Sequence, residues 1–265
     1  MKVYISADIE GTTGITNWEE ADKTHATYQE FRERMTDEVV AACEGAIEAG
    51  AKEILIKDAH DSGRNILQQD LPDCAQLIRA WSGHPFCMMQ ELDESFDAAL
   101  LVGYHSMAGD EGNPLAHTLS GKVSRMRLNG APTSEFLIAA YAAASVNVPV
   151  VFVSGDRLLG KHVESHNPGI VTVATSEGKG PSTISRAPKA VCAEIREGVE
   201  RALKGDLRKC LLKLPERFTL EIEYSDPVSA YKFSWYPGCE HIGNRTVRLE
   251  TRDYFEVLRA LMFIT

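Results

Sequence analysis

A repeating pattern of short apolar runs and amphipathic stretches is the feature of this sequence that most constrains its fold. Residues 3–5 are β-branched and aromatic and predict a strand, and residues 24–49 then repeat apolar side chains at helical spacing. Further strands are predicted at residues 53–59 and 98–104, and the uninterrupted apolar run at 148–153 is typical of a strand buried on both faces. A strand, a helix and another strand form the unit of a parallel sheet. The sequence therefore predicts an α/β fold with three layers and a mostly parallel sheet.

The pattern changes beyond Gly205. Residues 218–224 and 246–250 alternate strictly between apolar and polar side chains, which predicts strands with one solvated face. Helices are expected near residues 228–235 and from residue 253 onward. We therefore expect a smaller antiparallel α+β region after the α/β body.

The predicted domain boundary follows from this change. We assign residues 1–205 to an α/β domain and residues 206–265 to a small α+β domain, a division for which 265 residues suffice. A hairpin within residues 118–130, turned by Asn129-Gly130, belongs to the first domain by position, with the alternative that it packs with the second.

Two smaller elements are expected within the α/β domain. Residues 136–145 predict an apolar helix, for which Thr133 is the expected N-cap. A strand is expected at residues 170–174, before the helix at 189–203. These elements continue the alternation of strands and helices.

Composition excludes several classes of partner. The formal charge is −10, and no basic cluster is longer than Arg125-Met126-Arg127, which argues against nucleic acid and anionic membranes as ligands. No apolar run approaches the ~20 residues that span a bilayer, and the first residues do not resemble a secretory signal. The six cysteines are scattered without a C-x-x-C pair, as free thiols in a reducing compartment would be. We therefore expect a cytoplasmic location and no membrane association.

Two acids stand at the end of the first strand. Asp8 and Glu10 are two residues apart, so on an extended chain both carboxylates point to the same side. Like charges so close repel each other unless a cation lies between them. The alternative is that Asp8 caps the following turn and Glu10 is solvated.

Histidines follow two further strands of the predicted sheet. His60 comes directly after residues 53–59, and His105 directly after 98–104. Because ligands bind at the carboxyl ends of parallel strands, we expect these imidazoles to converge with the acids, although loops after strands are commonly polar for other reasons. Oxygen and imidazole donors without thiolates are typical of zinc, and also of manganese or iron, in a hydrolytic site. One bridging acid would hold two cations about 3.5 to 4 Å apart and lower the pKa of bound water.

Three other residues are candidates with plain alternatives. Glu135 can complete the metal site, but an acid in the first turn of a helix is also favoured by the helix dipole. His117 can act on the substrate or be an ordinary loop histidine. Asp58 can orient the imidazole of His60 or be an exposed acid at a strand end. Dinucleotide-binding, P-loop and G-x-S-x-G motifs are absent, which disfavours nucleotide binding and serine hydrolase chemistry.

Together these motifs resemble a known family. Ser6-Ala7-Asp8-Ile9-Glu10-Gly11, Asp58-Ala59-His60, Gly103-Tyr104-His105, Ala116-His117-Thr118 and Glu135 are similar to the motifs of the zinc-dependent D-aminopeptidases encoded beside bacterial dipeptide transporters. The resemblance runs the whole length of the chain. Two departures stand out: Ala139 occupies a position where the family typically has asparagine, and the carboxyl-terminal helix is short.

The resemblance implies a dinuclear zinc site with two Zn²⁺ per subunit. Asp8 would bridge the ions, with His60 and His105 on one and Glu10 and Glu135 on the other. His117 matches the family's catalytic histidine, described as nucleophile or base. The implied activity is removal of N-terminal D-residues, preferably D-alanine, from short peptides by a ring-shaped homodecamer.

We therefore expect a metal-dependent aminopeptidase whose α/β domain carries the metal site and the catalytic residues. The alternatives are another dinuclear-metal amide hydrolase or phosphoesterase, and a non-catalytic binding protein associated with peptide transport. The physiological substrate, the preference for D over L residues and the native metal do not follow from the residues themselves.

Overall fold

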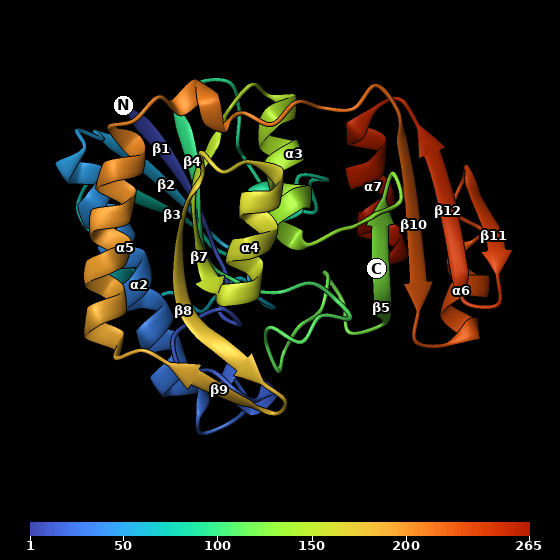
Figure 1. Cartoon of the computed structure of the whole chain (residues 1–265), viewed down its shortest axis with the longest axis horizontal. Helices are drawn as coiled ribbons and strands as arrows, with labels where there is room; N and C mark the ends of the chain where they lie inside the picture. The colour runs from blue at the N-terminus through green and yellow to red at the C-terminus, as the bar shows by residue number, and fades with distance from the viewer.

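The computed structural model describes all 265 residues, which form two sheets with flanking helices (Figure 1). The larger sheet has seven strands in the order β3-β2-β1-β4-β7-β8-β9. In chain order these strands are β1 (Lys2–Ala7), β2 (Glu53–Asp58), β3 (Ala75–Ile78), β4 (Ala98–Tyr104), β7 (Val150–Asp156), β8 (Val171–Lys179) and β9 (Ser182–Ser185). Every neighbouring pair is parallel except the β8–β9 hairpin. The predicted mostly parallel sheet is confirmed.

Helices cover both faces of this sheet and complete three layers (Figure 1). One face carries α2 (Tyr28–Glu48) and α5 (Pro188–Leu203), and the other carries α3 (Glu135–Ser145) and α4 (Arg157–His166). Every residue of β4 and β7 is buried as a result. Strands covered on both faces need apolar side chains in both directions, which explains why these strands are continuous apolar runs.

The smaller sheet is antiparallel, with five strands in the order β11-β12-β10-β5-β6. Its elements are β5 (Val123–Leu128), β6 (Ala131–Pro132), β10 (Phe218–Tyr224), β11 (Cys239–Gly243) and β12 (Thr246–Thr251), with α6 (Pro227–Phe233) and α7 (Tyr254–Ile264) beside it. Alternate residues of β10 are buried, as its pattern predicts. The hairpin strand β5 pairs with β10, so the hairpin lies in this sheet. The domain boundary at residue 205 stays a prediction.

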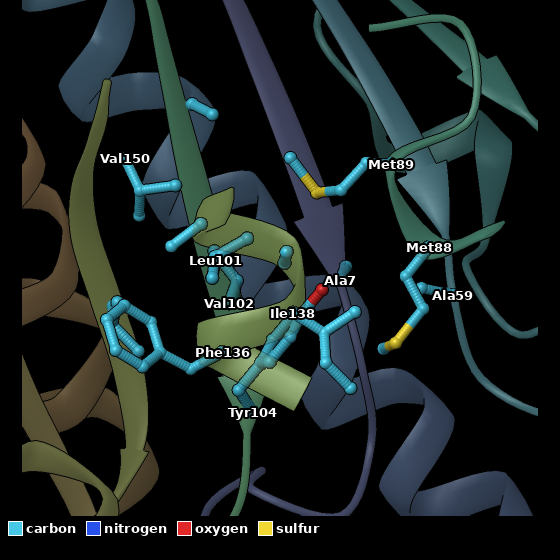
Figure 2. Close-up of a cluster of buried hydrophobic side chains, with 14 of the residues drawn as sticks. Ala7, Ala59, Met88, Met89, Leu101, Val102, Tyr104, Phe136, Ile138 and Val150 are labelled. Atoms are coloured by element: carbon cyan, nitrogen blue, oxygen red, sulfur yellow. The ribbon is translucent and has the colours of Figure 1, made fainter. Parts of the chain in front are cut away.

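A continuous hydrophobic core extends from one sheet to the other. Figure 2 shows part of it, where Phe136 and Ile138 of α3 pack over Leu101 and Tyr104 of β4. Helix α7 contacts α3 as well as β10 and β12, and the hydroxyl of Tyr254 donates to the carbonyl of Ile138 at 2.9 Å. Through α7, the smaller sheet is therefore tied to the helix that covers the larger one. No helix combines the length and the apolar character that crossing a bilayer requires.

The structure corrects three local predictions. The N-cap of α3 is Ser134, whose hydroxyl accepts from the amide of Leu137 at 3.3 Å; the predicted cap, Thr133, instead donates to the carbonyl of Ala131. The strand predicted at 170–174 is longer and continues into β9, whose one large apolar residue, Ile184, is 63% exposed. A single helical turn, α1 (Trp18–Ala21), interrupts the polar loop after β1. Three short 3₁₀ helices complete the fold: η1 (Gln68–Asp70), η2 (Cys87–Met89) and η3 (Leu207–Cys210).

Candidate metal centre

The candidate site lies where the order of the larger sheet reverses. From β1 the chain adds β2 and β3 on one side, whereas from β4 it adds β7 and β8 on the other. The crevice outside the carboxyl ends of strands at such a switch point is where open α/β sheets bind ligands. Asp8 directly follows β1, and His105 directly follows β4. With His60 just beyond β2, the structure brings together the strand-end residues that the sequence singled out.

Two glycines allow the ends of β1 and β4 to approach closely. The amide of Gly11 donates to the carbonyl of Gly103 at 2.8 Å. A Cβ at Gly11 would lie 1.7 Å from the carbonyl oxygen of Tyr104, and one at Gly103, where φ is +70°, would lie 2.3 Å from that of Asp8. Only glycine fits these positions. The motif glycines therefore determine the spacing between Asp8 and His105.

The acids and histidines form one buried cluster of facing oxygen and nitrogen atoms. Nδ1 of His60 lies 3.0 Å from Oε1 of Glu10 and 3.5 Å from Oδ1 of Asp8. Nε2 of His105 lies 3.4 Å from Oε2 of Glu135 and 3.6 Å from Oδ2 of Asp8. The two oxygens of Asp8 thus face the two imidazoles separately. This carboxylate lies between two halves of the cluster.

Backbone carbonyls hold the far nitrogen of each imidazole. Nε2 of His60 lies 2.9 Å from the carbonyl of Ala21, and Nδ1 of His105 lies 2.9 Å from the carbonyl of Ser106. Because a carbonyl only accepts, these ring nitrogens carry hydrogen and donate. Each near nitrogen can then offer a lone pair to the cluster, which is the arrangement found around metal-ligating histidines.

The residues present fit metal ions. Oε2 of Glu10 and Nε2 of His105 are buried and have no hydrogen-bond partner, which is costly for polar atoms unless they bind something. Two overlapping groups, Asp8 with Glu10 and His105, and His105 with His117 and Glu135, each bring their ligand atoms within 4.8 Å of one another. Carboxylate and imidazole donors of this kind are a hydrolytic zinc set. The cluster can therefore hold cations where the carboxylates face the imidazoles.

Charge is distributed unevenly among these groups. Burial, and then the charge of Glu10, raise the pKa of Asp8 well above its ordinary value. Burial also raises the pKa of Glu10, but the facing His60 outweighs it and holds this pKa well below the ordinary value. Burial lowers the pKa of His60, but the nearby Glu10 and Asp8 outweigh burial. The net effect holds this pKa well above its ordinary value. The carboxylates thus stabilise positive charge at the positions that a metal ion would occupy.

Glu135 reaches the cluster from the first turn of α3. Its Oε1 accepts from the amide of Leu119 at 2.6 Å, and its Oε2 faces His105. The helix dipole favours an acid at this position, as the alternative interpretation holds. The side chain is nevertheless buried against the imidazole, so the helix start also delivers a carboxylate to the cluster.

His117 lies at the edge of the same cluster. Its Nδ1 is held by the carbonyl of Leu115 at 2.9 Å, and its Nε2 lies 3.7 Å from Glu135 and 4.0 Å from Glu10. Its side chain is 15% exposed, whereas that of His105 is fully buried. His117 is therefore the imidazole of the cluster that a substrate can reach most directly.

Comparisons with known proteins agree with this arrangement. A sequence model of the peptidase M55 family, described as D-aminopeptidase, matches residues 1–263. The chain belongs to this D-aminopeptidase family. It is 30% identical over 267 residues to a D-aminopeptidase of Bacillus subtilis (strain 168), a match that covers 100% of this chain and 97% of the relative. Its fold is similar to that of the Zn-dependent D-aminopeptidase DppA from Bacillus subtilis, a self-compartmentalizing protease, with a TM-score of 0.94 and 28% sequence identity. This match covers 100% of this chain and 96% of the DppA chain.

Family membership confirms the resemblance seen in the sequence and the prediction of a peptidase. It favours hydrolysis of peptide bonds over phosphoester hydrolysis and over a non-catalytic role in transport.

The structure does not support the suggested role of Asp58. Its carboxylate accepts from the amides of Asn65 and Ile66 and from the side chain of Asn65, and no hydrogen bond joins it to the ring of His60. The Asn65 amide also donates to the backbone carbonyl of His60. Asp58 thus shapes the loop that carries His60, while the carbonyl of Ala21 orients the ring.

Sequence reasoning missed the short helix α1. It supplies Ala21, which holds His60, and Trp18, whose indole meets the ring of His117 at a centroid distance of 5.1 Å and an angle of 67°. A signal was present, because Asn17 and Glu20 form a capping box with the N-x-x-E spacing. One helical turn therefore contacts two histidines of the cluster.

The cluster opens into a cavity of about 720 Å³. Its lining includes Asp8, Glu10, Glu135, His60 and His117 of the cluster, together with Trp18 and exposed charged residues. Cavities of roughly 300–1,000 Å³ bury most of a small ligand. A short peptide can therefore reach the cluster.

Proposed function

We propose that this chain is a zinc-dependent aminopeptidase that removes N-terminal D-amino acids from short peptides. The observation that carries the proposal is that the near nitrogens of His60 and His105 face buried carboxylates at 3.0 Å and 3.4 Å, while a backbone carbonyl holds the far nitrogen of each ring. Zinc ions between these groups would satisfy both. The D-aminopeptidase family and the zinc dependence of the similar DppA support the same assignment.

The metal ligands of the proposed enzyme are Asp8, Glu10, His60, His105 and Glu135, and they would hold two ions per subunit. The distances favour Glu10 with His60 on one ion and His105 with Glu135 on the other. Asp8 would bridge, since each of its oxygens faces one of the two pairs. This grouping differs from that implied by the resemblance, which put both histidines on one ion. Manganese or iron would suit the same donors.

Zinc ions held in this way would polarise the carbonyl of the scissile bond and lower the pKa of a water molecule. His117 is the proposed catalytic residue. Its Nδ1 donates to the carbonyl of Leu115, so Nε2 carries the lone pair that accepts a proton from the attacking water and returns it to the leaving amine. The buried carboxylates would also attract the free α-amine of the substrate, which gives a physical reason for cleavage at the N-terminus.

We further propose that the chain assembles as a homodecamer in the cytoplasm. The description of DppA as a self-compartmentalizing protease supports an assembly that encloses its active sites. All six cysteines are unpaired, which is consistent with a reducing compartment. The expected mass by light scattering is ten times that of one chain.

A paired assay tests the proposed function. The purified protein is incubated with D-Ala-D-Ala and with L-Ala-L-Ala while its zinc content is measured by plasma mass spectrometry. We expect two zinc ions per chain and release of alanine from the D-dipeptide. Two bound metals without turnover of either dipeptide would contradict the peptidase assignment, and absence of stoichiometric metal would contradict the metal site as well.

A further inference from the structure

The cavity beside the cluster has an apolar wall that the proposed chemistry does not use. Helix α3 contributes Glu135 to the cluster and then Ile138, Ala139 and Ala142 to the cavity lining. These positions are i, i+3, i+4 and i+7, which form one row along a helix. At 1.5 Å of rise per residue, the row extends about 10 Å from the carboxylate. The cavity thus continues along α3 away from the metal ligands.

Helix α7 faces the same cavity with the same spacing. Its lining residues are Leu258, Leu261 and Met262, at i, i+3 and i+4, and its C-cap Thr265 follows at i+7. This helix belongs to the part of the chain that carries the smaller sheet, and it contacts α3 directly. Two helix rows from different parts of the chain therefore line the same cavity.

The loop around η2 contributes a third wall, which is rich in methionine. Met88 and Met89 line the cavity there, and Figure 2 shows Met88 and Ile138 directed toward one another beyond the end of β1. Met262 adds another methionine to the lining. Unbranched methionine side chains adapt to ligands of different shape. This wall is therefore suited to a range of apolar groups.

Apolar walls that face solvent favour a ligand with an apolar group. The apolar walls of this cavity contact water until an apolar group covers them, and a dialanine molecule has only methyl groups to do so. The charged residues that line the cavity outside the cluster, Asp22, Lys23 and Asp61, are exposed, whereas Ala142 and Leu258 are at most 2% exposed. Charge is thus confined to the exposed lining and the metal cluster.

We propose that this apolar chamber, formed by the α3 row, the α7 row and the η2 methionines, binds a large aliphatic or aromatic side chain of the substrate beside the scissile bond. The inference rests on the proposed peptidase function and names its substrate class: short peptides with a residue such as leucine or phenylalanine next to the cleaved bond. Ala139 and Ala142 are the specificity-determining residues, because they are the smallest apolar side chains of the α3 row that lines the chamber.

Rates on three dipeptides test the chamber in the zinc-loaded enzyme. The substrates are D-Ala-D-Ala, D-Leu-D-Ala and D-Ala-D-Leu. A single methylene in an apolar pocket changes kcat/KM by about 10-fold to 200-fold. We therefore expect at least a ~10-fold higher kcat/KM for one of the leucine peptides than for dialanine. Equal or lower values for both leucine peptides would overturn the proposal.

A filled chamber should abolish this preference. In Ala142→Leu the added carbons occupy the space between α3 and α7, so the leucine-to-alanine ratio of kcat/KM is expected to fall by at least ~10-fold. Ala144→Leu makes the same change on the half-exposed side of the same helix and should leave the ratio unchanged. A folded Ala142→Leu protein with the wild-type ratio would overturn the proposal.

Met262→Ala provides an independent variant on the other wall, where the side chain is only half-buried and folding is less at risk. It enlarges the chamber, so kcat/KM for a phenylalanine peptide should rise relative to that for the leucine peptide. No change in this ratio would contradict a role for α7.

Calorimetry separates this inference from the proposed function. Non-cleavable analogues of the same dipeptides, with a reduced peptide bond, are titrated into the zinc-loaded protein. A tighter Kd for a leucine analogue than for the alanine analogue supports the chamber even if no dipeptide is hydrolysed, in which case only the peptidase proposal fails. Equal Kd values beside normal hydrolysis of dialanine would overturn the chamber alone.

Discussion

The imidazole rings of His105 and His117 lie face to face, with centroids 4.4 Å apart and planes 9° apart. Two imidazolium ions stacked this closely would repel each other. The proposed division of roles would avoid that repulsion, because the buried His105 would bind metal while the more exposed His117 would act as the proton acceptor. The stacking thus supports distinct roles for two histidines that contact the same acid, Glu135.

We expect His117→Gln to lose turnover and keep its metal. Removal of a general base commonly lowers kcat by about 10²–10⁴. The other five residues of the cluster remain, so the zinc content measured by mass spectrometry should stay at the wild-type value. His241→Gln, at an exposed position of β11, is a control that should change neither quantity. Loss of zinc in His117→Gln would show that His117 is a ligand.

Asp8→Asn is expected to lose both zinc ions. The amide keeps the shape of the side chain but removes its charge and one of the two oxygens that face His60 and His105. Elemental analysis should therefore show loss of both metals rather than one. Asp58→Asn is the matched control, since Asp58 is a buried acid that binds backbone amides and not the cluster. The Asp58→Asn control should keep both zinc ions even if its stability falls. Retention of one zinc ion in Asp8→Asn would contradict the bridging role of Asp8.

Trp18 is expected to position His117 through the indole edge. Aromatic pairs of this geometry contribute about 0.5–1.5 kcal/mol, so Trp18→Ala should lower kcat by up to about tenfold. Trp18→Phe keeps an aromatic ring there and should recover most of the rate. Steady-state kinetics on D-Ala-D-Ala distinguish this role from a purely structural one, because a structural role would lower the thermal midpoint of both variants without a selective loss of kcat in Trp18→Ala.

The convergence of Asp8, His60 and His105 could be predicted because all three follow strands of one parallel sheet. A strand pattern predicts where a side chain leaves the sheet, and the parallel arrangement brings those ends together. The position of Glu135 was harder to predict, because it depends on how α3 crosses the sheet. Sequence periodicity does not determine a helix crossing angle. The apolar walls of the cavity are likewise a product of tertiary packing.

Other features were missed for local physical reasons. Strand β9 has only Ile184 as a large apolar residue among serines and threonine, so its sequence shows no apolar alternation. The side chain of Ile184 is itself exposed. Asp58 was linked to His60 by spacing alone. In the structure its carboxylate accepts hydrogen bonds from the backbone and side-chain amides of Asn65, in an irregular loop that no pattern predicts. Adjacent hydroxyl residues made the N-cap ambiguous, and backbone geometry selected Ser134 over Thr133.

Glu38 provides a prediction about pH and stability. This residue of α2 is buried, its Oε1 accepts from the amide of Thr13 at 2.9 Å, and its Oε2 has no partner. Burial raises its pKa from 4.5 to about 7. The folded state therefore binds this proton more tightly than the unfolded state, and the free energy of unfolding falls as pH rises from about 4.5 to about 7.

Glu38→Gln should remove this loss, since the amide keeps an acceptor for Thr13 without a buried charge. At pH 8.5 the variant is expected to be more stable than the wild type by up to about 3 kcal/mol, the equivalent of the shift from 4.5 to about 7. Near pH 4.5 both proteins carry a neutral side chain in the fold and the difference should largely vanish. Urea unfolding at the two pH values measures it, and Glu33→Gln, exposed on the same helix, is the control. An equal gain in the free energy of unfolding at both pH values would show that packing, rather than the buried charge, causes the difference in stability between the two proteins.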